Sequence, residues 1–218
     1  MIKNDLLRNV LPFIAMAIFA GVLVGCQKEE LLYSCDSKIN SWVIDHKDIY
    51  SDISRDELAK IEHDKQKGLF ASFSPEQKVK IYLNKYQYLM GLNTLSEKEK
   101  EYLTVLFQKL SPSIYSSEEE RIKFVEFSEN WSYEVVDKFG WDPIDVYRYT
   151  HTWLMNEEFE QWYKVRKSQK NLKSTKSECD CYYSFFGCPG LGICHSSSCS
   201  VVYDCGVFGS TGCDGTCD

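Results

Sequence analysis

Cysteine is the residue type whose number and spacing point most directly to chemistry in this sequence. The chain of 218 residues has 10 cysteines, and eight of them lie within residues 179–218. Cysteines this close together serve either as disulfide partners or as thiolate ligands of zinc. The eight are Cys179, Cys181, Cys188, Cys194, Cys199, Cys205, Cys213 and Cys217.

Disulfides explain this cysteine pattern better than zinc does. Zinc knuckles pair cysteines with two to four residues between them, and of the successive spacings only Cys194-x4-Cys199 and Cys213-x3-Cys217 fall in that range. His195 could supply a zinc ligand, but because it lies among serines a surface position is the simpler interpretation. A segment of 40 residues buries too little apolar surface to fold by burial alone, so covalent links are needed. We predict disulfides and no metal site, with the pairing left open by the spacing.

The N-terminus has the features of an export signal. Lys3 and Arg8 precede an apolar run of 15 residues, 10–24, which is shorter than the ~20 residues of a membrane-spanning helix. The run ends Leu23-Val24-Gly25-Cys26, which resembles a bacterial lipobox. That resemblance implies lipidation of Cys26 and removal of residues 1–25 as a signal peptide. The alternatives are a plain signal peptide and a single anchor helix.

Charged residues follow the predicted lipid site. Lys28, Glu29 and Glu30 resemble the signal that sends lipoproteins of some Gram-negative bacteria to the cell surface. The alternatives are a solvated tether over residues 26–35 and a position in the periplasm-facing leaflet. We therefore predict an outer-membrane lipoprotein that is exposed at the surface and contacts the membrane through its lipid. That compartment is oxidising, which favours disulfides.

One cysteine is left over by this assignment. With Cys26 carrying lipid, nine thiols remain, and nine cannot all pair within one chain. Cys35 is far in sequence from the C-terminal cluster, so we predict that it is the spare. It is then either buried among the helices or paired with another molecule.

The middle of the chain, residues 36–168, has the pattern of a helical bundle. Four segments begin with helix-start residues, at Ser74, Ser96, Ser117 and Asn156. Apolar residues recur every three or four positions after these starts, as on the buried face of a helix. Further helices are expected near Asp36 and from Pro143, and Gly140 is well placed to end the one that starts at Ser117. The predicted fold is mainly α: a small helical bundle followed by a short disulfide-rich C-terminal domain.

The helical region has no recognisable catalytic or cofactor motif. Its histidines are His46, His63 and His151, and no spacing ties any of them to a nucleophile or to a second metal ligand. We predict that the protein is not an enzyme and binds no cofactor. The many aromatic residues either form the core or line a recognition groove, and helical spacing favours the core.

Charge divides the chain into segments. The net charge is −7 and no long basic block is present, which argues against nucleic acid as a partner. A lysine-containing stretch over residues 169–178 has the composition of a flexible linker. The domain that follows, residues 179–218, contains no lysine or arginine. Nothing in the sequence fixes the oligomeric state.

The first half of the C-terminal cysteine pattern resembles a known family. The run Cys179-x-Cys181-x6-Cys188-Pro189-x-Leu191-x2-Cys194 is similar to the opening of fulvocin C, a small disulfide-rich bacteriocin, and to the lipoproteins related to it. After Cys199 the spacing departs from that family. The resemblance implies a lipid-anchored carrier with an antibacterial C-terminal domain, displayed or released by cleavage of the linker.

Two interpretations of the C-terminal domain therefore stay open. An aromatic cluster within it either contacts a target-cell membrane or receptor or forms the small core of the domain; its members are Tyr182, Tyr183, Phe185 and Phe186. The alternative to antibacterial activity is a non-enzymatic binding or adhesion module, in which the cysteine-rich tail is the recognition element.

Overall fold

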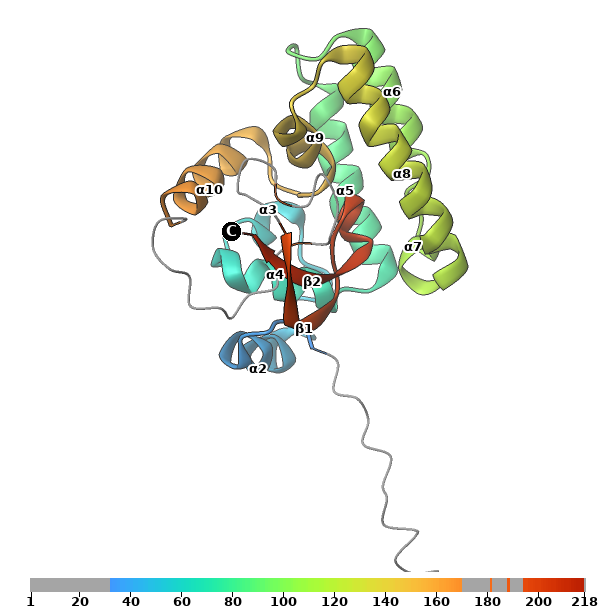
Figure 1. Ribbon diagram of the computed structural model, residues 1–218. Coiled ribbons are helices and arrows are strands. Elements are labelled where there is room, and N and C mark those ends of the chain that lie inside the picture. Colours follow the sequence, from blue (N-terminus) through green and yellow to red (C-terminus); the bar gives the residue numbers. More distant parts are fainter. Residues whose placement is uncertain (1–31, 170–180, 182–187, 189–193, 218) are drawn as a thin grey trace, which may run out of the picture. The chain divides into compact units, whose positions relative to one another are not determined.

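The structure is a computed structural model that describes residues 32–169, 181, 188 and 194–217 (Figure 1). Within these ranges it describes the backbone alone at residues 63–64, 166, 169, 197–204, 214 and 216–217.

Three of the longer helices begin where their serine caps predict. Each cap hydroxyl accepts a hydrogen bond from a backbone amide three residues later, which satisfies one of the free donors at a helix start. At Ser96 the backbone amide of the cap donates in turn to the Glu99 carboxylate, which completes a capping box. The three helices are α5 (Pro75–Met90), α6 (Glu97–Phe107) and α8 (Glu118–Phe139). Gly140 ends α8 in the left-handed conformation, with φ 66°.

Three further helices were also expected from the sequence. The Asp36 and Asp142 carboxylates accept bonds from backbone amides two residues later, at 2.7 Å and 2.9 Å, and so begin their helices. In the third helix the Glu158 carboxylate accepts a bond from the Met155 amide, so the helix begins one residue after Met155. These helices are α2 (Ser37–His46), α9 (Pro143–Thr150) and α10 (Asn156–Gln169).

The sequence did not predict the remaining short helices. Ser54 and Glu57 form a capping box at the start of one of them. A second has no side-chain cap at Glu62, which removes the signal that marked the longer helices. They are α3 (Arg55–Leu58), α4 (His63–Ser72) and α7 (Ser113–Ser116).

The C-terminal segment forms a β-hairpin, which the sequence analysis did not predict. Strand β1 (Cys194–Cys205) pairs antiparallel with β2 (Thr211–Cys217), and the 3-10 turn η1 (Val207–Gly209) joins them. The register shifts between Ser196 and Val201 and again before Cys205, so the longer strand bulges along its length. Cys181 adds an isolated bridge to Gly215.

The core joins this hairpin to the helices. Val207 and Phe208 belong to the same cluster of buried apolar residues as Tyr82, Leu106 and Phe124 of the helices. The contacts of the chain accordingly place Leu32–Asp218 in one compact unit. In Figure 1 the hairpin lies against α4, with which β1 is in contact.

The fold prediction, mainly helical with a disulfide-bonded C-terminal stretch, is confirmed. The division into bundle, linker and C-terminal domain stays a prediction, because residues 170–180 lie outside the described part of the chain. Among the described residues, no helix has both the length and the apolar character needed to cross a membrane.

Candidate functional site

Two disulfides hold the hairpin at its two ends. Cys181 is bonded to Cys194, the first residue of β1, across 13 positions of sequence. Cys205 is bonded to Cys213 across eight positions, and this bond brackets the turn that joins the strands. Such links remove conformations from the unfolded chain and so stabilise a small segment that buries little apolar surface.

Two more cysteines of the described chain are also disulfide-bonded: Cys35 and Cys188. The prediction that Cys35 is the spare thiol is therefore wrong. It rested on distance in sequence, whereas disulfide formation depends on distance in space. The side chains of Cys179, Cys199 and Cys217 lie outside the described residues.

Three sulfurs gather at the base of the hairpin. The Sγ atoms of Cys181, Cys188 and Cys194 lie within 4.8 Å of one another, and all three residues are buried. Trp162 and Tyr163 of α10 pack against this cluster. Zinc requires thiolate ligands, and these three cysteines are in disulfides. The cluster therefore acts as a small covalent core that rests on α10.

The turn at the other end of the hairpin has an uncommon backbone. Gly206, Phe208 and Gly209 have φ values of 73°, 57° and 61°. Glycine adopts such values freely, but an L-residue such as phenylalanine does so at a cost of roughly 1–2 kcal/mol. A β-carbon at Gly206 would also lie 2.7 Å from the Thr211 hydroxyl oxygen. The turn therefore needs an interaction that compensates for the backbone strain at Phe208.

That compensation comes from a set of helical residues that we call the aromatic socket: Tyr82, Phe107, Tyr115 and Phe124. The Phe208 ring is fully buried, with its centroid 4.6 Å from that of Phe107 and 5.0 Å from that of Tyr82. The Phe124 ring stacks on it at 5.8 Å. Burial of a phenylalanine ring stabilises by about 1.5–3 kcal/mol, which offsets the backbone cost.

A hydrogen bond fixes the depth of this insertion. The Tyr115 hydroxyl donates to the Phe208 carbonyl over 2.7 Å, and both groups are buried. Burial raises the pKa of Tyr115 well above its usual value of 10, so the hydroxyl keeps its proton. The bond therefore remains available across the physiological pH range.

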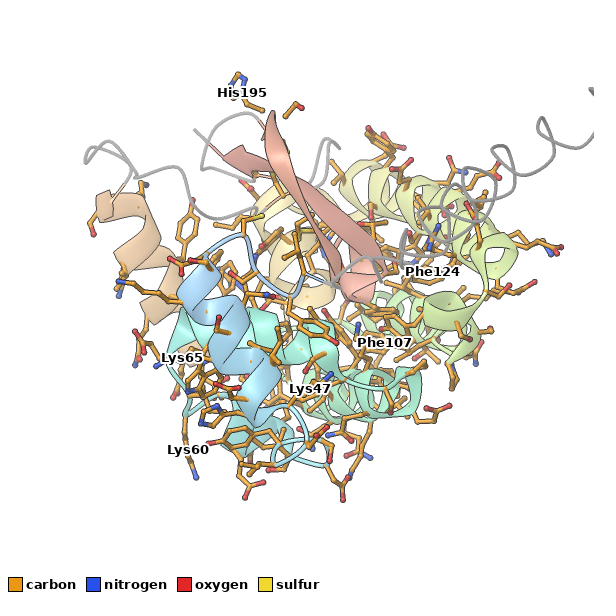
Figure 2. The ribbon with its side chains drawn as sticks, turned by 90° about the horizontal axis from the view of Figure 1, so that it is seen from below. Lys47, Lys60, Lys65, Phe107, Phe124 and His195 are labelled. Atoms are coloured by element: carbon orange, nitrogen blue, oxygen red, sulfur yellow. A yellow bond between two sulfur atoms is a disulfide. The ribbon has the colours of Figure 1, made fainter. Side chains whose placement is uncertain are left out.

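The socket is assembled by four helices. Tyr82 comes from α5, Phe107 from α6, Tyr115 from α7 and Phe124 from α8. Figure 2 shows Phe107 and Phe124 beside the turn of the hairpin, and His195 at its other end, directed away from the helices. His195 and Ser196 are exposed. The turn of the hairpin is thus buried among the helices, whereas at the other end the side chains of His195 and Ser196 face solvent beside the buried cysteine cluster.

Most of the aromatic residues confirm the core interpretation. Tyr82, Trp141, Tyr149 and Trp153 are buried in the apolar core. Among the aromatic residues whose side chains the structure describes, Tyr133 is the exception, since 54% of it is exposed. The predicted aromatic cluster at residues 182–186 lies outside the described residues.

Two histidines of the helices, His46 and His151, are packed against neighbouring residues. His46 stacks on Trp42, with centroids 4.5 Å apart, and its Nδ1 lies 2.7 Å from the Trp42 carbonyl oxygen. Burial lowers the pKa of His151 to about 3, so this ring is neutral at physiological pH. Its Nδ1 lies 2.9 Å from the Thr150 hydroxyl, a hydroxyl–imidazole pair, but Thr150 is fully buried. The side chain of His63 lies outside the described part.

A buried lysine, Lys85, joins separate segments of the helical body. The Lys85 ammonium donates to the carbonyl oxygens of Arg148, at 3.1 Å, and Leu154. Desolvation, followed by the positive charge of Arg55, lowers the pKa of Lys85 to about 7. Arg55 in turn is paired with Glu158 over 2.7 Å. With its ammonium held by two backbone carbonyls, this group links α5 to the segments around α9.

The predicted N-terminal sites cannot be placed. Cys26, Lys28, Glu29 and Glu30 all lie outside the described residues, and so does Cys179. Their predicted roles in lipidation, export and disulfide formation therefore rest on the sequence.

Comparison with protein-family models, with curated proteins and with solved structures finds no match to this chain. The resemblance to the fulvocin C-related lipoproteins stays a prediction based on the cysteine spacing.

Proposed function

We propose that this chain is a non-enzymatic, lipid-anchored envelope protein that presents its C-terminal hairpin as a binding element at the cell surface. The observation that carries the proposal is the different setting of the two ends of the hairpin. Phe208 is fully buried among the helices, whereas His195 and Ser196 at the far end are exposed (Figure 2). A hairpin held in this way is presented by the intact protein.

Rigidity suits the hairpin to recognition. A binding segment that is already ordered loses less conformational entropy when it meets its partner, so more of the contact energy appears as affinity. Disulfides at both ends, Cys181–Cys194 and Cys205–Cys213, supply that order here. The chemistry of the exposed end, an imidazole beside serine hydroxyls, favours a hydrogen-bonding partner such as a glycan or a polar receptor surface.

The anchor is proposed from the sequence. Cys26 carries the lipid and Lys28-Glu29-Glu30 directs the protein to the outer face of the outer membrane. Cys26→Ala should abolish incorporation of labelled palmitate and leave the protein soluble. Continued labelling of that variant would refute the lipid site.

Binding is tested with the soluble Cys26→Ala chain on a glycan array and on intact cells. Replacing His195 and Ser196 together with alanine should weaken binding at least about tenfold, which corresponds to about 1.4 kcal/mol. Ile122→Ala is the matched control, because Ile122 is an exposed residue of α8. Equal binding by both variants, or no binding to any probe, would contradict the proposal.

Antibacterial activity is the second candidate, and the cysteine spacing from Cys179 to Cys194 is what favours it. The test applies the soluble, oxidised Cys26→Ala chain, intact or cut in the linker, to a broad panel of related bacteria. Growth inhibition of any strain would support this activity, through a target-cell membrane or receptor. Absence of inhibition across the panel, both by the soluble chain and by cells that carry the wild-type protein, would remove it.

A further inference from the structure

Cys35 is placed at the start of the helical body. It directly precedes Asp36, whose carboxylate begins α2, and it is half-buried and disulfide-bonded. The segment around it is held in place. The Tyr33 amide donates to the Asn40 side chain over 2.8 Å, and Asn40 is itself buried in α2.

The start of α2 lies close to the hairpin. Helix α2 packs closely on α4, since a β-carbon at Gly68 would lie 2.7 Å from Val43 and 3.4 Å from the Tyr33 carbonyl oxygen. Helix α4 is in contact with β1. Figures 1 and 2 both show the segment that leads into α2 beside β1.

Few cysteines are left to pair with Cys35. Two pairs are already formed, Cys181–Cys194 and Cys205–Cys213. The remaining candidates are Cys26 and four cysteines of the C-terminal segment: Cys179, Cys188, Cys199 and Cys217. Under the proposed function Cys26 is a thioether to lipid and has no thiol to contribute.

We infer that Cys35 forms a disulfide with one of these four C-terminal cysteines and so ties the membrane-proximal end of the protein to its hairpin. To form the bond, the two thiols pass two electrons and two protons to a disulfide oxidant of the envelope, which leaves as two thiols. Three of the four cysteines then remain. If Cys188 is one of these three, it pairs with a second of them, because it is disulfide-bonded. Either way an odd number remains, and a single thiol is left in the C-terminal segment.

The link changes what cleavage of the linker does. A cut within residues 170–178 leaves the hairpin covalently joined to the helices through Cys35. With Cys26 lipidated, the hairpin also stays attached to the membrane. This consequence and the exclusion of Cys26 as the partner of Cys35 both rest on the proposed anchor, whereas a test of the cross-link in a chain without Cys26 does not.

The test uses the full chain with Cys26→Ser, so that its outcome is independent of lipidation. A protease recognition sequence is inserted between Asn171 and Leu172, and the folded protein is alkylated, cut and run on a denaturing gel. We expect one band without reductant, two bands after reduction, and one alkylated cysteine per chain by mass. Two bands without reductant would overturn the inference.

Variants locate the bond. Cys35→Ser should give two bands without reductant, while the matched Cys205→Ser/Cys213→Ser control, which removes a bond internal to the hairpin, should still give one. Should Cys35→Ser fail to accumulate, mapping of the unreduced peptides of the uncut parent decides. A peptide that joins Cys35 to a cysteine of the C-terminal segment supports the inference, and any other partner overturns it. Failure of palmitate labelling in the wild-type chain would remove the anchor alone.

Discussion

Replacing Phe208 with alanine tests whether the hairpin is part of the fold. The ring is fully buried and contacts Tyr82, Phe107 and Phe124, so its removal leaves a cavity between four helices. Truncation of a buried phenylalanine costs about 3–5 kcal/mol of unfolding free energy. Alanine retains a β-carbon, so the cost of the left-handed backbone at φ 57° is not relieved. We expect a loss of about 3–5 kcal/mol, a large part of the 5–15 kcal/mol typical of a folded domain.

Urea unfolding without reductant measures this loss, because the disulfides then stay intact in both states. Tryptophan fluorescence is a suitable signal, since Trp131, Trp141 and Trp153 are buried in the same core. Hydrogen exchange gives a local reading. The amides of Gly209 and Ser210 donate within the turn and should exchange faster in the variant.

The matched control is Ile122→Ala on α8, where 58% of the residue is exposed. Its unfolding free energy should stay within about 0.5 kcal/mol of the parent value. The reasoning is refuted if Phe208→Ala costs less than about 1 kcal/mol and leaves exchange at the turn unchanged. The hairpin would then not be seated in the aromatic socket.

Further predictions concern single groups around the same core. Tyr115→Phe leaves the Phe208 carbonyl buried without its donor and should cost about 1–3 kcal/mol in urea unfolding. Gly206→Ala, at φ 73° and against Thr211, should cost about 1–3 kcal/mol, and no change in the urea midpoint would contradict the strained turn. The pKa of Lys85 is lowered by burial to about 7 from 10.5, so the unfolded chain holds this proton at pH values where the folded chain releases it. Stability should therefore rise between pH 7 and 9, by about 2 kcal/mol from this group, and the rise should disappear in Lys85→Met.

Local signals explain how much of the helical body could be predicted. The starts at Ser74, Ser96 and Ser117 are set by a hydroxyl and an amide three residues apart, so the sequence alone contains both partners. Helix α4 begins at His63 without a side-chain cap and is held by its contacts with α2 and β1. Contacts of that kind join distant parts of the chain and leave no local pattern.

The socket could not be predicted for the same reason. The Phe208 carbonyl accepts a hydrogen bond from Tyr115, which is 93 positions away in the sequence. The left-handed backbone of Phe208 is also uncommon for a phenylalanine. The only local sign was the pair of glycines, Gly206 and Gly209, that flank Val207 and Phe208. The strands were missed because cysteine and serine at these positions do not alternate with apolar residues, and cross-links hold the pairing.

The two attachments of the hairpin bear on which proposed function can operate. Shedding a free toxin would require more than a cut in the linker, because Phe208 would have to leave the core and the proposed Cys35 bond would have to be reduced. Loss of the contacts of the Phe208 ring alone costs about 3–5 kcal/mol, so this ring lies outside the aromatic socket in fewer than about one molecule in a hundred at any moment. With the proposed lipid anchor in place, a protein that inhibits other bacteria would therefore do so while attached to its own cell, on contact. Inhibition by attached cells but not by their culture fluid would support that mode, and inhibition by cell-free fluid alone would exclude it.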